Sequence, residues 1–247
     1  MEKAATKKRK ITIIKGGFIL SVVGALAIIL SGYGYQWNWW DLGTGFSVLI
    51  PYGTALAALG GLAAIIAYLR LKSRPRNYAI TAFVSLMIGL IALGNATYWY
   101  VEMQKGYPPI HDITTDTESP PEFEAIAPLR KNAPNPVEYA GAETAKMQAD
   151  FYPDIETFYI SLPYSEAYDR ALKTAESMPW SIVDTNKEDG RIEGYQKLPW
   201  FGFIDDVVIR VDTTEDGSKI DIRSKSRLGR GDIGVNAKRI RKYLEKL

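Results

Sequence analysis

The sequence contains no cysteine and a single histidine among its 247 residues. Without cysteine, a disulfide framework, a thiolate metal site and a cysteine nucleophile are all excluded. The G-x-S-x-G and H-E-x-x-H motifs are absent as well, so neither a nucleophile elbow nor a zinc-protease helix is present. We therefore expect no metal and no cofactor, and we assign no catalytic residue.

Asp, Glu, Arg and His are also absent from three apolar stretches in the first hundred residues, at about 16–33, 46–69 and 78–98. Each is close to the ~20 residues that a helix needs to cross about 30 Å of hydrocarbon. The sequence thus predicts a membrane anchor of three transmembrane helices over residues 1–104. The first is expected to stay uncleaved, because no A-x-A-like site follows it. Transport is not predicted, since an ion or proton relay needs ionisable groups inside the spans.

Small residues in the second stretch favour close helix packing. Ala57 and Gly61 form one small-xxx-small pair, and Gly60 and Ala64 form another. Such pairs let a second helix approach closely. We expect the partner to be a neighbouring span of the same chain.

The distribution of Lys and Arg predicts the orientation of the anchor. Five of them precede Ile11 and four lie between residues 70 and 76, whereas the loop of residues 34–45 has none and is rich in Trp and Tyr. Short cytoplasmic loops keep cations. The amino terminus is therefore expected in the cytoplasm and residues 101–247 outside it, in the periplasm or cell exterior of a bacterium. A lipid bilayer, the inner (plasma) membrane, is the first expected partner, and nucleic acid is not expected.

Residues 105–136 contain seven prolines, which leave little room for a helix. We expect an extended arm. Ile110, Ile113, Phe123 and Ile126 are apolar enough to pack on the folded domain. The arm should therefore lie across that domain rather than act as a free linker, followed by a short helix near residues 140–149.

Residues 137–247 predict one extracytoplasmic α+β domain. Alternation typical of half-buried strands recurs at 158–162, 180–185, 191–197, 206–211 and 219–227, and helical spacing occurs at 164–175 and from about residue 232. Turn-rich segments join three of the strands, which indicates an antiparallel meander. The predicted order β-α-β-β-β-β-α is helix-grip-like, with two helices packed on an antiparallel sheet.

Charge is segregated along the chain. Residues 111–218 carry nine Lys and Arg against twenty-two Asp and Glu, whereas residues 219–247 carry ten against three. The two parts either neutralise each other within the fold, or the basic end presents a cationic face to anionic lipid, acidic glycan or an acidic protein.

The carboxyl-terminal third contains specific motifs. They are GFIDDVVIR at residues 202–210, DIRSKSRLG at 221–229 and DIGVNAKRI at 232–240, together with HDITT at 111–115 and the later Pro120-Pro121. Over about residues 107–247 the chain closely resembles the family known as domain of unknown function 1499. This resemblance implies a bacterial envelope protein, and it implies no established activity, substrate or catalytic residue.

Alternation in the last predicted strand places Asp221, Arg223, Lys225 and Arg227 on one face. Three cations on one face repel unless they are paired, and Asp205 and Asp206 on the neighbouring strand are the expected partners in a structural ion-pair network. The alternative is a site that binds an anion or a partner near the amino terminus of the last helix. Its candidate residues are Arg223, Lys225, Arg227, Arg230, Asn236 and Arg239.

The only histidine, His111, lies near Asp112 and Asp116. A carboxylate that orients an imidazole can produce a general base. The same aspartates more simply accept backbone hydrogen bonds in an Asx-type turn. We therefore expect a membrane-anchored binding or scaffolding module for a protein or an anionic envelope component. The alternative is an extracytoplasmic hydrolase that uses His111 and an Arg-lined cleft.

Overall fold

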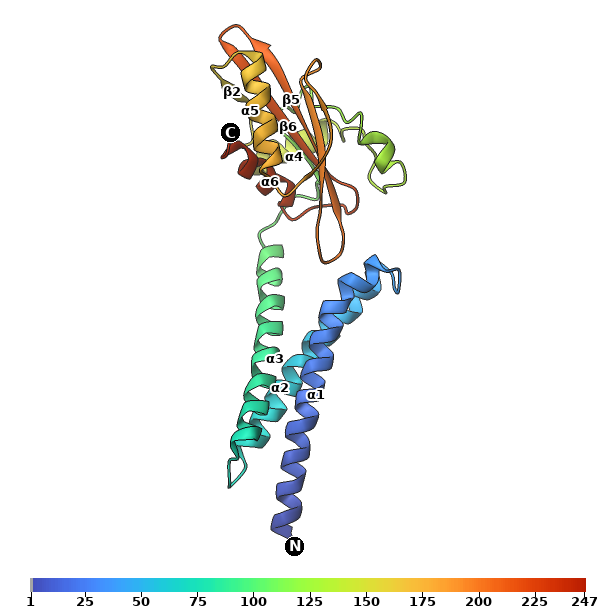
Figure 1. The fold of residues 1–247 in the computed structure, drawn as a ribbon. Coiled ribbons are helices and arrows are strands. Elements are labelled where there is room, and N and C mark those ends of the chain that lie inside the picture. The colour runs from blue at the N-terminus through green and yellow to red at the C-terminus, as the bar shows by residue number, and fades with distance from the viewer. Residues whose placement is uncertain (1) are drawn as a thin grey trace. The chain divides into compact units, whose positions relative to one another are not determined.

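The computed structural model describes residues 2–247, which form two compact units (Figure 1). One unit contains the residues up to Gln104 together with Trp200–Gly202, and we call it the membrane unit. The other contains Lys105–Pro199 and Phe203–Leu247, and we call it the α+β unit. The predicted fold class is confirmed, because three long apolar helices precede an antiparallel sheet with packed helices.

Three helical segments of the membrane unit are long and apolar enough to cross a membrane. Helix α1 spans Glu2–Gln36, a π-helical turn η1 at Thr44–Leu49 runs into α2 at Ile50–Leu69, and α3 spans Arg76–Met103. All three extend beyond the apolar stretches read from the sequence, because polar residues at the ends continue the backbone hydrogen bonding where water is available.

Small residues bring these helices into close contact. A Cβ atom on Gly17 of α1 would lie 2.5 Å from the carbonyl oxygen of Gly60 in α2, so only glycine fits there. The hydroxyl of Ser21 donates to the carbonyl of Ala57 at 3.2 Å. On its other side α2 meets α3, where a Cβ on Gly61 would lie 2.5 Å from the Ser85 carbonyl oxygen. Both small-residue pairs in α2 thus pack against neighbouring spans.

The α+β unit is built on one antiparallel sheet, in the order β1-β6-β5-β4-β3, with β2 also paired to β6. The strands are β1 Asp112–Thr114, β2 Phe158–Ile160, β3 Ser181–Asn186, β4 Arg191–Lys197, β5 Ile204–Thr214 and β6 Gly217–Ser226. Strands β3 to β6 form the predicted meander. Strand β1, which comes from the Pro-rich arm, was not predicted.

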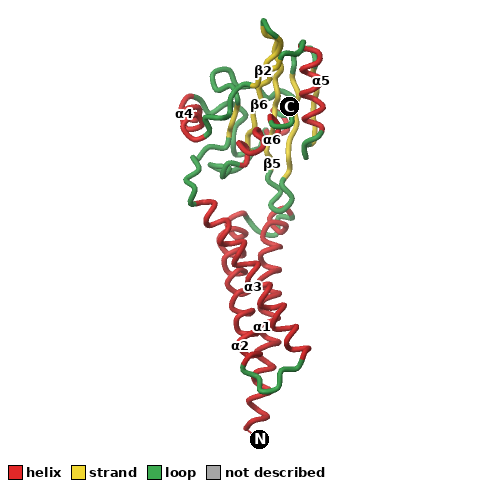
Figure 2. Tube along the Cα trace, turned by 90° about the vertical axis from the view of Figure 1, so that its left-hand side faces the viewer, coloured by secondary structure: helices red, strands yellow, loops and turns green. Residues whose placement is uncertain are grey.

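Helices α5 (Tyr164–Glu176) and α6 (Val235–Leu244) cover one face of the sheet, and Figure 2 shows α5 on one side of the strands with loop segments on the other. The small side chains Ala167, Ala171 and Ala175 let α5 approach the sheet closely, and all three are buried. From the strands, Val207, Ile209, Ile220 and Ile222 complete this core. Their alternate spacing follows from the two-residue period of a strand.

The arm covers the opposite face. Val208 points away from its neighbours Val207 and Ile209, and it packs with Phe123 and Ile126 of the arm. The four apolar arm residues noted in the sequence are all buried. The arm is extended at β1 but not throughout, because a short 3-10 turn, η2, forms at Ala127–Arg130.

Helix α4 (Ala142–Phe151) protects the free edge of β1. The side-chain amide of Gln148 accepts a hydrogen bond from the Thr114 N–H at 3.0 Å and donates to the Thr114 carbonyl at 2.6 Å. An edge strand exposes unpaired backbone groups that invite further pairing. Gln148 satisfies both groups at this position and so closes that edge.

Candidate functional site

The polar face of β6 lies beneath the arm and carries most of the candidate residues. Because Ile220 and Ile222 face the helices, the alternate residues Asp221, Arg223 and Lys225 face the arm. Arg223 and Lys225 have side chains only 2% and 1% exposed. Two buried cations two residues apart on one strand require counterions, because the cost of removing a charge from water is several kcal/mol.

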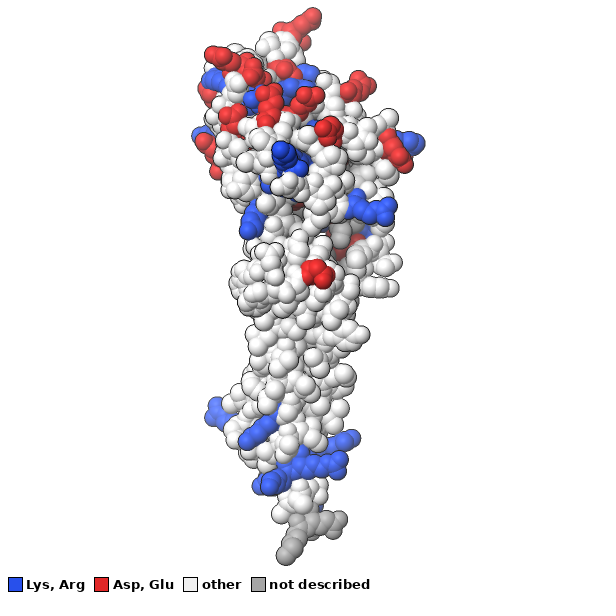
Figure 3. Space-filling model, turned by 90° about the vertical axis from the view of Figure 1, so that its right-hand side faces the viewer, with Lys and Arg blue, Asp and Glu red and all other residues white. Residues whose placement is uncertain are grey.

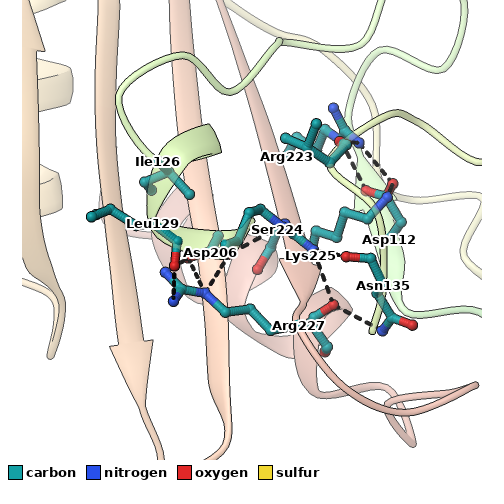
Figure 4. A network of polar contacts seen from close by, with 12 residues as sticks. Asp112, Ile126, Leu129, Asn135, Asp206, Arg223, Ser224, Lys225 and Arg227 are labelled. Carbon is teal, nitrogen blue, oxygen red and sulfur yellow. Dashed lines mark hydrogen bonds and ion pairs between the residues drawn. The ribbon is translucent and has the colours of Figure 1, made fainter. Parts of the chain in front are cut away.

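Asp112 supplies the counterion for both cations (Figure 4). Its carboxylate accepts two hydrogen bonds from the Arg223 guanidinium, at 2.9 and 2.8 Å, and one from the Lys225 ammonium at 2.8 Å. The β1–β6 register places Asp112 opposite Lys225, so backbone pairing fixes this contact. Burial lowers the pKa of Lys225, and the Asp112 carboxylate opposes that change. Asp112 therefore ties the arm to the sheet.

Asp206 forms a second buried centre. It receives hydrogen bonds from the Arg227 guanidinium at 2.7 to 3.1 Å, and the Arg130 guanidinium lies 3.2 Å from it. Burial raises the pKa of the Asp206 carboxyl, and the hydrogen bonds from Arg227 act against that rise. Of the three cations for which Asp205 and Asp206 were the expected partners, only Arg227 contacts Asp206, and the other two pair with Asp112.

The two centres together hold four cations, Arg130, Arg223, Lys225 and Arg227, against the carboxylates of Asp112 and Asp206. Backbone carbonyl oxygens of the arm, and of the two residues that follow it, accept further hydrogen bonds from these cations. They belong to Pro121 and Val137 for Arg223, Glu138 for Lys225, Leu129 for Arg227 and Asn135 for Arg130. Proline has no N–H, so a Pro-rich segment has more acceptors than donors. The Arg and Lys side chains of the sheet donate hydrogen bonds to these surplus carbonyl oxygens.

Glu193 of β4 provides the complementary contact. Its carboxylate, which is fully buried, accepts three consecutive backbone N–H groups from Glu124, Ala125 and Ile126, each at 2.9 Å. Charge-assisted hydrogen bonds of this kind are about twice as strong as neutral ones. Glu193 therefore holds this part of the arm through its backbone N–H groups. The sequence analysis missed it, because nothing distinguishes this glutamate from one on a solvent face.

Asp205, next to Asp206, lies on the helix side of the sheet. Its carboxylate pairs with Arg239 of α6 at 2.6 Å, and Arg239 also donates to the Ser224 hydroxyl and the Asn236 side-chain oxygen. The Asn236 amide in turn donates to the His111 carbonyl at 3.1 Å and to the Ser226 hydroxyl at 2.9 Å. Arg239, a candidate residue of the anion or partner site, is thus buried and paired within the domain.

The three residues of the hydrolase alternative make separate contacts. The His111 ring lies 3.4 Å from the carbonyl of Arg230, and Arg230 itself is exposed. Asp112 is occupied by the two cations of β6. Asp116 accepts the N–H groups of Glu118 and Ser119 in an Asx turn, and it also pairs with Arg210.

Two open pockets of about 490 and 390 Å³ flank the arm, and His111 lines neither of them. Arg130 and Lys131 line the larger pocket, whereas the smaller carries charges of both signs, including Arg191 and Glu124. Across residues 2–247, no three His, Asp or Glu side chains are grouped closely enough to hold a metal ion. The site is therefore a closed electrostatic clamp between sheet and arm, composed of Asp112, Arg130, Glu193, Asp206, Arg223, Lys225 and Arg227.

These features define a membrane protein in which three apolar helices precede an α+β unit with a clamped arm. Residues 112–247 match the family model described as Protein of unknown function (DUF1499), and the chain belongs to this family. The match begins at Asp112, the residue that links the arm to β6. Comparison with curated proteins and with solved structures gave no match.

Proposed function

We propose that this protein is a binding or scaffolding module of the bacterial envelope, anchored in the inner membrane, and that it acts by contacts rather than by catalysis. One observation carries the proposal. The family-motif cations Arg223 and Lys225 are enclosed by Asp112 and by arm carbonyls, so the motif fixes the architecture of the domain. A partner would then be recognised by the outer surface of the domain.

The arrangement of charge in the membrane unit supports the proposed orientation. The ammonium of Lys10 donates to the Arg70 carbonyl at 2.6 Å, so the two cationic segments lie at the same end of the helices. Figure 3 shows Lys and Arg gathered at that end, with a long uncharged surface beyond it. Short loops on the cytoplasmic side of a membrane carry an excess of Lys and Arg. On this basis the amino terminus lies in the cytoplasm and the α+β unit in the periplasm or outside the cell.

Two surfaces of the α+β unit are suited to a partner. Tyr159 on β2 is 70% exposed, the largest value among the exposed large apolar side chains of this unit. On α6, Lys242 is exposed, whereas Arg241 pairs with Asp154; just beyond the helix, Lys246 is also exposed and donates to Ser177. The first surface suits an apolar protein contact, and the second suits anionic lipid or an acidic protein.

A photocrosslinking experiment in intact membranes tests this proposal. A benzophenone amino acid replaces Tyr159 or Lys242 in the full chain, with Glu215 in the β5–β6 turn as the matched exposed control. We expect a discrete adduct from Tyr159 or Lys242 and none from Glu215. The same adduct should persist when Asp112, Arg223 and Lys225 are replaced together by Leu, Met and Met, because apolar residues can replace a buried ion network that is structural. No discrete adduct from either position would refute a binding role. Loss of the adduct in a triple variant that still resists trypsin would instead place the binding site in the clamp.

A further inference from the structure

The loop between β4 and β5 contains the sequence Leu-Pro-Trp-Phe-Gly-Phe at residues 198–203, with no charged residue. It lies in a stretch of chain that is otherwise rich in Asp and Glu. Its central residues, Trp200–Gly202, belong to the membrane unit. Trp and Phe side chains combine a large apolar area with, for Trp, one polar N–H, a combination typical of residues at the edge of a membrane.

Within the membrane unit, Trp200 and Phe201 make specific contacts. The indole N–H of Trp200 donates to the backbone carbonyl of Ile29 at 2.9 Å, and the side-chain amide of Gln36 donates to the Trp200 carbonyl at 2.8 Å. The Phe201 ring centroid lies 4.4 Å from that of Phe46, and Phe201 is only 5% exposed. Trp200 is only partly buried, and its indole N–H is nevertheless hydrogen-bonded to the helix.

Glycines of α1 and η1 create the space for these rings. A Cβ atom on Gly32 would lie 2.4 Å from Trp200 Cδ1, and a Cβ on Gly45 would lie 3.2 Å from the Phe201 ring. Gly202 has φ +68°, a left-handed conformation, and a Cβ there would meet the Gln36 side chain at 2.7 Å. By contrast, a Cβ on Gly16, also in α1, would meet nothing within 4 Å. A residue without a side chain is therefore required at the three contact positions, Gly32, Gly45 and Gly202.

We propose that Trp200-Phe201-Gly202 is a plug and that Gly32, Gly45 and Phe46 line its socket on the transmembrane helices of the same chain. The occupant and the binding surface are thus two segments of one protein, joined by ring packing and two hydrogen bonds. The plug thereby adds to the membrane unit an aromatic segment that α1, η1, α2 and α3 alone do not supply.

Engineered disulfides test the plug directly, because the native chain has no cysteine. The pair Phe46→Cys/Phe201→Cys is compared in membranes with Phe46→Cys/Glu215→Cys, in which the second cysteine lies in the turn at the other end of β5. Under mild oxidation we expect the first pair to form an intramolecular disulfide more than about tenfold faster, because docking raises the effective concentration of the two thiols. Equal rates for the two pairs, or a disulfide-linked dimer as the main product, would overturn the proposal.

Two further variants separate loss of docking from loss of folding. Gly32→Leu in the Phe46→Cys/Phe201→Cys background should reduce disulfide formation to the rate of the control pair, whereas Gly16→Leu should leave it unchanged. Trp200→Ala, which cannot disturb the packing between helices, should also slow the reaction. Unchanged rates in both Gly32→Leu and Trp200→Ala would refute the socket.

Discussion

Asp112→Ala is the most informative substitution in the α+β unit, because it removes the counterion of two buried cations at once. The Arg223 guanidinium would lose two hydrogen bonds of 2.9 and 2.8 Å, and the Lys225 ammonium would lose one of 2.8 Å. Breaking a buried ion pair by removing one partner costs about 3–5 kcal/mol. We expect Asp112→Ala to lower the free energy of unfolding of the α+β unit by an amount in this range.

The matched control is Asp154→Ala, which removes the partner of Arg241 on the surface. That pair has side chains 55% and 36% exposed, and exposed pairs contribute less than about 1 kcal/mol. Pulse proteolysis of the full chain in detergent and urea measures the midpoint of unfolding for the α+β unit. With a slope of roughly 2 kcal/mol per molar urea, Asp112→Ala should lower the midpoint by about 1.5 M or more.

Asp112→Leu combined with Arg223→Met and Lys225→Met should recover most of that loss, because no charge then remains without a partner. A shift for Asp112→Ala no larger than that for Asp154→Ala would contradict a structural role for Asp112. In that case the cations would reach water or the arm carbonyls would suffice, and the clamp would not hold the arm.

Three other predictions concern separate features. Glu193→Gln should cost about 2 kcal/mol in the same assay, because an amide cannot accept all three N–H groups as the carboxylate does; a wild-type midpoint would contradict this. Burial holds the pKa of His111 below its usual range, so the stability contributed by neutral His111 is present above the unfolded-state pKa and is lost as pH falls through the folded-state pKa. Unfolding midpoints at about pH 7 and about pH 5 should therefore differ less in His111→Gln than in the wild type, and equal differences would exclude this role. The fragment of residues 105–247 should sediment with anionic but not zwitterionic vesicles and less so as salt rises, and Lys242→Glu/Lys246→Glu should abolish binding, whereas equally low sedimentation with both lipids would leave a protein as the partner.

Local patterns were sufficient to predict the spans, the β3–β6 meander and the two helices on the sheet. Alternation placed Asp221, Arg223 and Lys225 on one face of β6, because the period of a strand is a property of the backbone. The pairing of Asp112 with Arg223 and Lys225 could not be predicted, because it depends on β1, a three-residue strand more than a hundred residues away in the chain. Short strands carry almost no periodic signal.

The orientation of α6 shows the same limit. The helix begins at Val235 rather than near Asp232, whose carboxylate accepts the N–H groups of Gly234 at 2.9 Å and Asn236 at 2.6 Å. The buried face therefore includes Arg239 and Tyr243. An arginine on the inner face contradicts the usual pattern of an amphipathic helix, and its contacts with Asp205, Ser224 and Asn236 account for it.

The proposed envelope role requires the α+β unit to lie on the opposite side of the membrane from the amino terminus, and single-cysteine labelling tests this directly. The native chain supplies no thiol, so Lys72→Cys in the loop before α3 and Glu215→Cys in the β5–β6 turn each report one position. A membrane-impermeant maleimide added to cells with a permeable outer membrane should label Glu215→Cys at once and Lys72→Cys only after the inner membrane is opened. Labelling of Lys72→Cys in intact cells, with Glu215→Cys protected, would contradict the proposed envelope role.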